Sequence, residues 1–239
     1  RLVNNGVWHP SGEFVVGRKH FTGSRSLGAG EMWMWRVPSV GQPTEKHAGT
    51  QLTWRKHDQQ DINEPVLSPD GKFLYWSEDT SPGPWFEYNK DPNGQIYVIR
   101  RLEIATGEIV DLIAQPGGAV RPQISPDGKQ LAYVRRVRLK SVLMVYDLAA
   151  GTHTAVWDGL SLDQQETWAH FGAHPGFSWA SSSEIVVSAQ GKLHRVNVGT
   201  KTVTPVPFAA RVKQEVGDPV RPKITVGGAS FPVKTIRWP

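Results

Sequence analysis

The chain has 239 residues, of which 38% are hydrophobic, so it is long enough to bury a substantial core. Its 27 basic and 22 acidic residues give a formal net charge of +5, but they are spread along the sequence. This spread argues against nucleic-acid binding, which needs basic residues gathered on one face beside stacking aromatic residues. The chain has no cysteine, which excludes disulfides and thiolate metal sites. No apolar run approaches the roughly 20 residues of a membrane span, and no segment has the pattern of a signal peptide.

A tight-turn motif recurs along the chain. It occurs as His9-Pro10-Ser11-Gly12, as Ser68-Pro69-Asp70-Gly71-Lys72, as Ser125-Pro126-Asp127-Gly128-Lys129 and, in degraded form, as Ala180-Ser181-Ser182-Ser183. Pro presets φ, Asp bonds back to the backbone and Gly accepts a positive φ, so each copy predicts a reversal between two strands. From Gly12 through Gly71 and Gly128 to Ser183 the intervals are 59, 57 and 55 residues. Such periods indicate a repeat protein.

A second series of turns runs in phase with the first. It occurs at residues 105–108, 149–152 and 198–201, each after a segment of alternating apolar residues. Each repeat therefore contains two hairpins, and β-branched and aromatic residues fill the predicted strands. No long stretch has helical apolar spacing. These features predict an all-β fold, a β-propeller of four four-stranded blades.

The repeat intervals also predict the blade boundaries. The four blades are expected at residues 1–60, 61–120, 121–176 and 177–232, with 233–239 as the start of a further blade. Four units and one extra strand either close as a small ring or form part of a larger propeller, and the abrupt chain ends favour the larger propeller. Open blade edges would then invite self-association. Trp8, Trp179 and Trp238 stand at equivalent first-strand positions, where they are expected to pack between blades.

The longest connections fall on one face of the predicted propeller. Both series of turns lie on one face, the turn face, so the loops between second and third strands and between blades lie on the other, the loop-rich face. Long loops are expected at 18–30, 78–94 and 135–140, and the links 56–64 and 162–168 both contain Asp-Gln-Gln. Loops on a rigid scaffold commonly carry function, so the loop-rich face is the candidate binding surface. Its candidate residues are Lys19, His20, Arg25, Glu31, Glu64, Asp79, Glu87, Asn89, Lys90, Arg136, Glu166 and His170.

The polar residues of the loop-rich face could bind a ligand or catalyse a reaction, or they could form structural ion pairs. Residues 61–64 alternate like oxygen ligands of calcium, but the central Gly and terminal Glu of a twelve-position calcium loop are absent. Lys19 and His20 near Glu31 resemble an acid–base set, yet ion pairs that hold a long loop to its blade are more common. We expect the mixed charges to form salt bridges with one another. Accordingly, no catalytic residue, metal ligand or cofactor is predicted in this segment.

The turns and several longer segments carry a family resemblance. The Ser-Pro-Asp-Gly-Lys turns resemble those of TolB-like, WD-repeat-like propellers of bacteria. Four segments resemble the propeller that precedes a metal-dependent amidohydrolase domain in bacterial proteins, namely Arg18–Thr22, Arg25–Glu31, Phe86–Asn93 and Gln165–Trp168. The resemblance implies an N-terminal propeller in a periplasmic or secreted protein, with the hydrolase barrel and its metal ligands beyond residue 239.

Three functions remain open from the sequence. The first is a noncatalytic scaffold that docks on or gates a hydrolase domain of the parent chain. The second is a TolB-like module that binds a protein partner in the periplasm. The third is an enzyme with its site in the central funnel, which would need several His or carboxylate side chains to converge there. No Gly-x-Ser-x-Gly elbow is present, so a nucleophile of the prolyl-oligopeptidase type is not expected in this chain.

Overall fold

In the part of the chain that the structure describes, β-strands are the only regular secondary structure. The computed structural model describes residues 3–22, 28–38, 49–57, 60–80, 90–167 and 172–217, with positions 220, 227, 228, 230, 232 and 235. Within these ranges there is no helix that could cross a membrane. The strands are β1 (Val3–Trp8), β2 (Phe14–Thr22), β3 (Gly28–Arg36), β4 (Thr50–Gln51), β5 (Ile62–Leu67), β6 (Phe73–Asp79), β7 (Tyr97–Glu103), β8 (Ile109–Ile113), β9 (Val120–Ile124), β10 (Gln130–Val137), β11 (Lys140–Asp147), β12 (Thr152–Trp157), β13 (Phe177–Ser181), β14 (Glu184–Ala189), β15 (Lys192–Asn197) and β16 (Val203–Val206).

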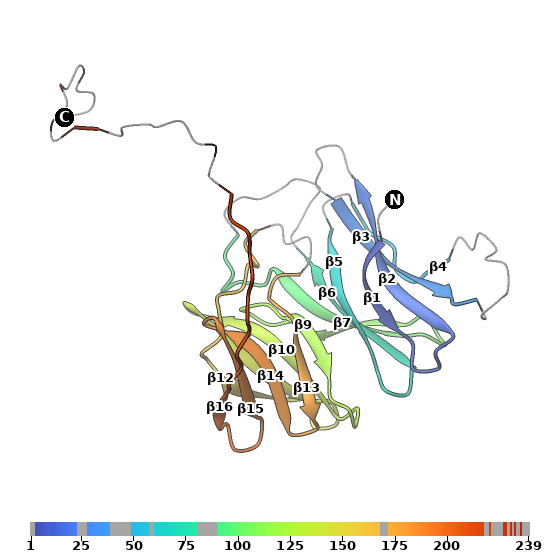
Figure 1. Ribbon diagram of the computed structural model, residues 1–239. Coiled ribbons are helices and arrows are strands. Elements are labelled where there is room, and N and C mark those ends of the chain that lie inside the picture. The colour runs from blue at the N-terminus through green and yellow to red at the C-terminus, as the bar shows by residue number, and fades with distance from the viewer. Residues whose placement is uncertain are drawn as a thin grey trace. The chain divides into compact units, whose positions relative to one another are not determined.

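These strands form four antiparallel sheets, each made of four strands that are consecutive in the chain. The first strands of neighbouring sheets contact one another, β1 with β5, β5 with β9 and β9 with β13. Figure 1 shows the sheets following one another from the blue β1–β4 sheet to the orange β13–β16 sheet. This is the arrangement of four β-propeller blades, as the repeat predicted.

The predicted turns between first and second strands are confirmed in atomic detail. In blade 2 the Ser68 hydroxyl donates to Asp70 Oδ1 at 2.6 Å and accepts from the Phe73 amide at 2.9 Å. In blade 3 the Ser125 hydroxyl makes the same two bonds, to Asp127 and from Gln130, at the same distances. The following glycines have φ of 74° and 72°. The motif therefore closes the same hairpin in both blades because its chemistry is the same.

Apolar side chains fill the space between consecutive blades. Because side chains alternate along a strand, each blade has one face toward the blade before it and one toward the blade after it. Val16 and Met32 of blade 1 pack against Leu74 and Trp76 of blade 2. Two further clusters fill the next two interfaces, with Tyr75, Ile99, Leu131, Tyr133 and Met144 in one and Ala132, Val134, Leu143, Phe177 and Ile185 in the other.

Two of the expected long loops are shorter than the sequence indicated. Strand β2 continues to Thr22 and β3 begins at Gly28, so Lys19, which was expected in a loop, pairs with Glu31 in the β2–β3 ladder. Strands β10 and β11 likewise pair as far as Val137 and Lys140. The expected loop 135–140 is therefore a tight turn, in which Arg138 has a positive φ of 54°. Charged residues in these hairpins hid the strand pattern, because Arg18, Glu31 and Arg136 are buried at positions where a strand pattern predicts apolar side chains.

The first and last parts of the chain differ from the predicted pattern. Trp179 donates from Nε1 to the Gln123 carbonyl of blade 3 at 2.9 Å, as expected for interblade packing, whereas Trp8 in blade 1 is 62% exposed. Trp8 has no preceding blade within the described residues to cover it. Strand β16 ends at Val206, and residues 208–217, in a separate unit, form no strand. Trp238 and nearly all of the further blade expected at 233–239 lie outside the described residues.

Candidate functional site

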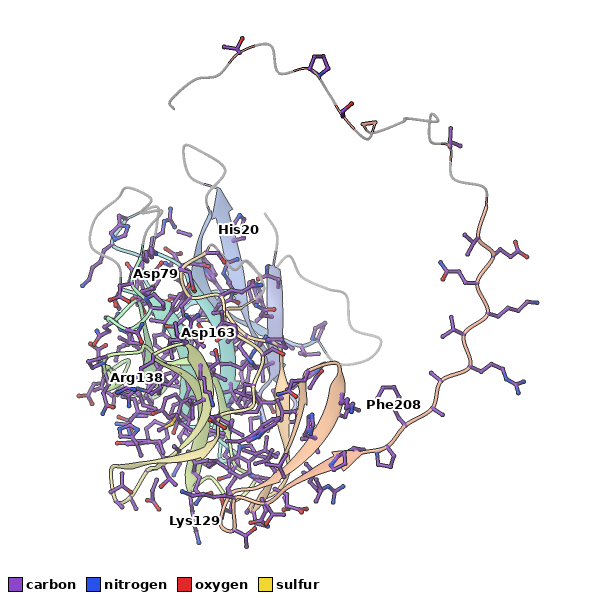
Figure 2. The ribbon with its side chains drawn as sticks, turned by 90° about the vertical axis from the view of Figure 1, so that its left-hand side faces the viewer. His20, Asp79, Lys129, Arg138, Asp163 and Phe208 are labelled. Carbon is purple, nitrogen blue, oxygen red and sulfur yellow. The ribbon has the colours of Figure 1, made fainter. Side chains whose placement is uncertain are left out.

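The loop-rich face is formed by the ends of β2, β6 and β10 and by the links between blades. Figure 2 shows His20 and Asp79 at this end of the blades and Lys129, in a first-to-second-strand turn, at the other. Eight of the twelve predicted residues are described, and Arg25, Glu87, Asn89 and His170 lie outside the described residues.

The junction between blades 1 and 2 contains a buried ion pair that the candidate set did not include. Arg18 on β2 is fully buried and donates to the Asp61 carboxylate and, at 2.8 Å, to the Ile62 carbonyl. Its Nη1 lies 3.1 Å from His20 Nδ1, which places this predicted residue at the rim of the pair. A side chain at Gly30, the residue opposite His20 on β3, would collide with the guanidinium. The sequence placed Gly30 in a loop, whereas the structure shows that glycine is required there for the close approach of Arg18.

Burial alters the protonation of Asp61 at this junction. Burial raises its pKa from 3.8 to about 6 against the opposing effect of Arg18, and the nearby Asp79 adds to the increase. Burial also raises the pKa of Tyr97 on β7, with the carboxylates of Asp79, Asp61 and Glu64 adding to the effect. The predicted residues Glu64 and Asp79 therefore share one electrostatic neighbourhood with Asp61.

The junction between blades 3 and 4 repeats this arrangement. Arg136 on β10 donates to both carboxylate oxygens of Asp163, at 2.9 and 3.0 Å, and its Nη2 lies 3.1 Å from Glu166 Oε2. Burial alone would raise the pKa of Asp163, but hydrogen bonds from Arg136 and Ser141 bring it below the ordinary value. Both Asp-Gln-Gln links thus supply an acid for a buried arginine of the preceding blade.

Glu64 links three parts of the propeller. Its carboxylate accepts from the Ser77 hydroxyl and the Arg121 amide, both at 2.5 Å, and from the Ala173 amide at 3.0 Å. Glu64 has φ of 61°, and Asn5 and Arg121, at the same position in the first strands of blades 1 and 3, have φ of 50° and 57°. Each lies where the register between first and second strands shifts. In blades 1, 2 and 3 these bulges are a repeated feature that directs one side chain toward a neighbouring blade or link.

The other predicted residues also have protein partners. Lys90 Nζ lies 2.6 Å from Asp79 Oδ2, and Glu31 Oε1 accepts from Arg55 Nη1 at 2.9 Å. Lys19 Nζ lies 3.4 Å from the centre of the Trp33 ring. The Lys19, His20 and Glu31 set therefore does not converge on one point, since His20 faces Arg18 and Glu31 faces Arg55.

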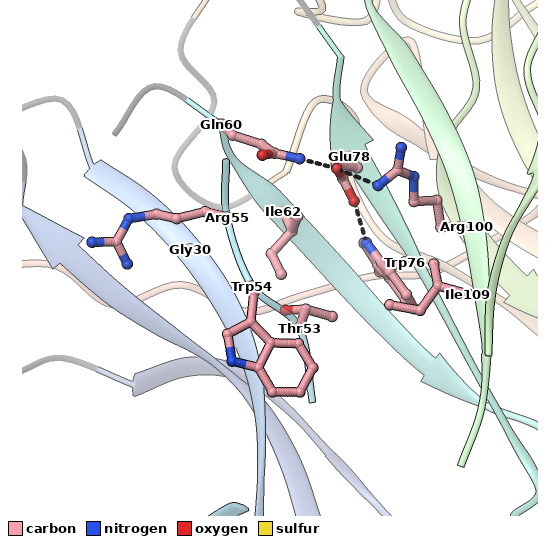
Figure 3. A pocket seen from close by; sticks show the side chains of 10 residues that line it. All are labelled: Gly30, Thr53, Trp54, Arg55, Gln60, Ile62, Trp76, Glu78, Arg100 and Ile109. Carbon is pink, nitrogen blue, oxygen red and sulfur yellow. Dashed lines mark hydrogen bonds and ion pairs between the residues drawn. The ribbon is translucent and has the colours of Figure 1, made fainter. Parts of the chain in front are cut away.

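A small hollow lies beside the first junction. Figure 3 shows Glu78 within it, accepting from Gln60, from Arg100 at 2.8 Å and from Trp76 Nε1 at 3.0 Å. Burial raises the pKa of Glu78, with Arg100 opposing the change. The hollow has a volume of about 30 Å³, which is room for water and not for a substrate.

Comparison with known proteins identifies the fold. No family model and no curated protein matches the chain. Among solved structures, TolB from Acinetobacter baumannii superposes with a TM-score of 0.59 at 15% identity, over 84% of this chain and 43% of TolB. This is a TolB-like β-propeller fold.

Enzymes that contain the same fold also superpose on the propeller. A puromycin hydrolase matches with a TM-score of 0.58 at 17% identity, over 86% of this chain and 28% of the hydrolase. An oligogalacturonate lyase in complex with manganese matches with a TM-score of 0.56 at 15% identity, over 84% of this chain and 50% of the lyase. The chain therefore spans half or less of these proteins, and such identities establish the fold alone.

The TolB-like propeller also has exposed apolar side chains on the loop-rich face, which the sequence did not single out. Val137 and Leu139 at the β10–β11 turn are 46% and 89% exposed, and Leu162 in the following link is 56% exposed. The bond from Arg136 to Asp163 brings the two segments together. Among the described residues no three His, Asp or Glu side chains are grouped to hold a metal ion. This face therefore combines internally paired charges with exposed leucines.

Proposed function

We propose that this chain is a noncatalytic β-propeller that docks on, or gates, a hydrolase-type catalytic domain through its loop-rich face. The observation that carries the proposal is the use of its buried charges. Arg18 with Asp61, and Arg136 with Asp163 and Glu166, form pairs across the blade junctions. Groups held in this way fix the geometry of a rigid surface and are poorly placed to act on a substrate.

The exposed residues beside these pairs support a docking role. Leu139 and Leu162 flank the Arg136 junction, and large exposed apolar side chains near a rigid charged surface are typical of protein interaction sites. The puromycin hydrolase supports a hydrolase as partner, because a TolB-like propeller accounts for only part of its length. By analogy with bacterial TolB-like proteins, we also propose that the protein is periplasmic or secreted.

One observation favours an enzyme as the second candidate function. Asp61 has a pKa of about 6, within the range useful for proton transfer near neutral pH, and it lies in one electrostatic neighbourhood with Tyr97. Against this, the Asp61 carboxylate is bonded to Arg18, whose guanidinium is fully buried. An enzyme of this kind would need a substrate to displace that pair.

Turnover measurements separate the two candidates. The purified chain is incubated with p-nitrophenyl esters and with peptide p-nitroanilides, with and without added Zn²⁺ or Mn²⁺. We expect no release of p-nitrophenol or p-nitroaniline above the protein-free blank. Turnover that Asp61→Asn abolishes, with the fold retained by circular dichroism, would refute the scaffold proposal and establish the enzyme.

Site-specific crosslinking tests the docking face. A photoreactive benzoyl-phenylalanine replaces Leu139 on the loop-rich face or, as a matched control, the exposed Lys129 on the turn face. After irradiation in the source cells, we expect a hydrolase segment to be crosslinked at position 139 and not at 129. Crosslinking of a non-hydrolase partner at 139 would favour the TolB-like binding module. The same product at both positions would contradict a docking face.

A further inference from the structure

A cavity of about 330 Å³ opens on the turn face, between the first-to-second-strand turns of blades 2 and 3. Asp70 and Asp127 of those turns line it, together with Phe73, Tyr75 and Arg101 on β6 and β7, the two middle strands of blade 2. Its volume is at the lower end of the range of small-molecule sites. It lies on the opposite face from the proposed docking surface and does not depend on that proposal.

The cavity exists because blade 2 departs from the pattern of its neighbours. Tyr75 on β6 stands opposite Arg101 on β7, facing blade 3. The corresponding pair in blade 1 is Val16 with Met34, and in blade 3 it is Ala132 with Val145. Those pairs pack in the apolar cores of their own interfaces. Among the three blade interfaces that the structure describes, the one between blades 2 and 3 has a phenol and a guanidinium in place of the apolar pair. The cavity lies beside these two side chains.

Arg101 lies in the cavity without an anionic partner. Its guanidinium carbon is 4.8 Å from the centre of the Phe73 ring, which covers one face of the cation. The side chain is half-buried, and within the described residues it makes no hydrogen bond or ion pair. A guanidinium carries five N–H donors in a planar fork that fits a carboxylate. Neighbouring arginines do find such partners, as Arg100 does with Glu78 and Asp111.

The two aspartates supply the opposite charge on the cavity's rim. Hydrogen bonds from the Ser68 and Ser125 hydroxyls, followed by backbone amides, lower the pKa of Asp70 and of Asp127. In each carboxylate these bonds engage the same oxygen, Oδ1. Within the described part of the chain, Oδ2 of Asp70 has one distant charged contact, 3.8 Å from the exposed Lys72 ammonium. Ionised acceptors therefore lie at the entrance, and the unpartnered cation lies beside them.

We propose that this cavity binds a small ligand with a carboxylate at one end and a cationic or hydrogen-bond-donating group at the other. The carboxylate pairs with Arg101, and the cationic end lies between Asp70 and Asp127. Free amino acids and the C-terminal residue of a short peptide share this chemistry. The aromatic ring of Phe73 and the side chain of Leu148 provide the apolar walls for the ligand's carbon atoms.

Nuclear magnetic resonance titration of the ¹⁵N-labelled chain tests the site. The probes are L-lysine, the dipeptide Ala-Lys and Ala-Lys with a C-terminal amide, with the Arg101 Nε–H resonance as the readout. We expect the free carboxylate forms to shift this resonance saturably and the amide to bind at least about tenfold more weakly, since it cannot make the charge-assisted pair. If lysine binds more tightly than Ala-Lys, the ligand is a free amino acid. If Ala-Lys binds more tightly than lysine, the ligand is the C-terminal end of a peptide.

Variants assign the binding to the cavity. Arg101→Met, which copies Met34 of blade 1, should weaken Ala-Lys binding at least about tenfold, read from backbone amide shifts. Arg195→Met is the matched control, because Arg195 has the equivalent register position in blade 4 but is exposed and paired with Glu184. Arg101→Lys, which keeps the charge but not the fork, serves if the Met variant fails to fold, and should weaken binding too. Equal binding of acid and amide, unaltered affinity in the folded Arg101 variants, or no saturable shift would each overturn the proposal.

Discussion

Replacing Arg136 by Met is expected to destabilise the propeller by about 3–5 kcal/mol at neutral pH. The Arg136 side chain is only 5% exposed and makes bonds to both oxygens of Asp163. Met preserves much of the aliphatic stem, so the main loss is the charge. Asp163 is fully buried and would keep only its bonds from Ser141 and the Gln165 amide. An uncompensated buried carboxylate accounts for most of the cost.

The structure also fixes the pH dependence of this variant. In the native chain the pKa of Asp163 is lowered, so its stabilising contribution is present at neutral pH and is lost as the pH falls through that lowered pKa. Without Arg136, burial is left as the largest influence and the pKa of Asp163 rises. The variant should therefore gain stability as the pH falls from neutral toward about 5, which is the opposite trend.

Thermal unfolding followed by circular dichroism measures both effects. For a folded unit of 207 residues each kcal/mol corresponds to a shift of about 2–4 °C, so Arg136→Met should lower Tm by roughly 6–20 °C. Lys140→Met is the control, because it removes an exposed ion pair with Asp158, the residue just after β12, and it should leave Tm unchanged. A Tm within experimental error of the native value for Arg136→Met would refute the assigned role of the pair.

Three further outcomes are expected. The raised pKa of Asp61 implies that its stabilising contribution is complete below the ordinary value of 3.8 and is lost as the pH rises through about 6. Asp61→Asn should flatten that part of the stability profile, and an identical urea profile for variant and native chain between about pH 4 and 8 would contradict it. Glu64→Gln replaces one carboxylate oxygen by an NH2 group that would face a backbone N–H donor, and it should cost about 1–3 kcal/mol in urea unfolding, whereas no loss would mean that the Glu64 contacts are not stabilising. Gly118→Ala forces a Cβ into Gln165 Oε1 and should lower Tm more than Gly107→Ala, whose Cβ meets open space at a similar positive φ; equal shifts would argue against the contact.

The fold was predictable because the repeat is written in residues whose chemistry is local. Ser68, Asp70 and Gly71 close their turn with bonds between residues no more than five positions apart, so the motif predicts the turn without knowledge of the rest of the chain. The motif occurs four times at nearly equal intervals, so the repeat predicts four sheets. The repeated Asp-Gln-Gln links were also visible, and a comparison of their following acids, Asp61 and Glu166, would have indicated a shared partner type.

The candidate site was less predictable because its contacts are not local. The partners Arg18 and Asp61 are separated by 43 residues, and Glu64 and Ala173 by 109, and no sequence spacing encodes those distances. The left-handed backbone of Glu64 is equally hidden, since nothing in its neighbours indicates a bulge. Arg101 could not be identified from the sequence for another reason. Only the strand register shows that it occupies the position of the apolar Met34 and Val145 in the neighbouring blades.

The two arginine junctions use the same chemistry but have different electrostatic surroundings. Asp163 receives a hydroxyl from Ser141 in addition to its arginine, and its pKa is lowered. Asp61 has Arg18 but also the negative charge of Asp79 nearby, and burial prevails, so its pKa is raised to about 6. Acidification from neutral pH therefore protonates the acid between blades 1 and 2 well before the one between blades 3 and 4. Because Asp79 is itself paired with Lys90, whatever moves Lys90 also changes the charge that Asp61 experiences. A partner that covered Lys90, as the proposed docking role would allow, is therefore expected to shift the pKa of Asp61.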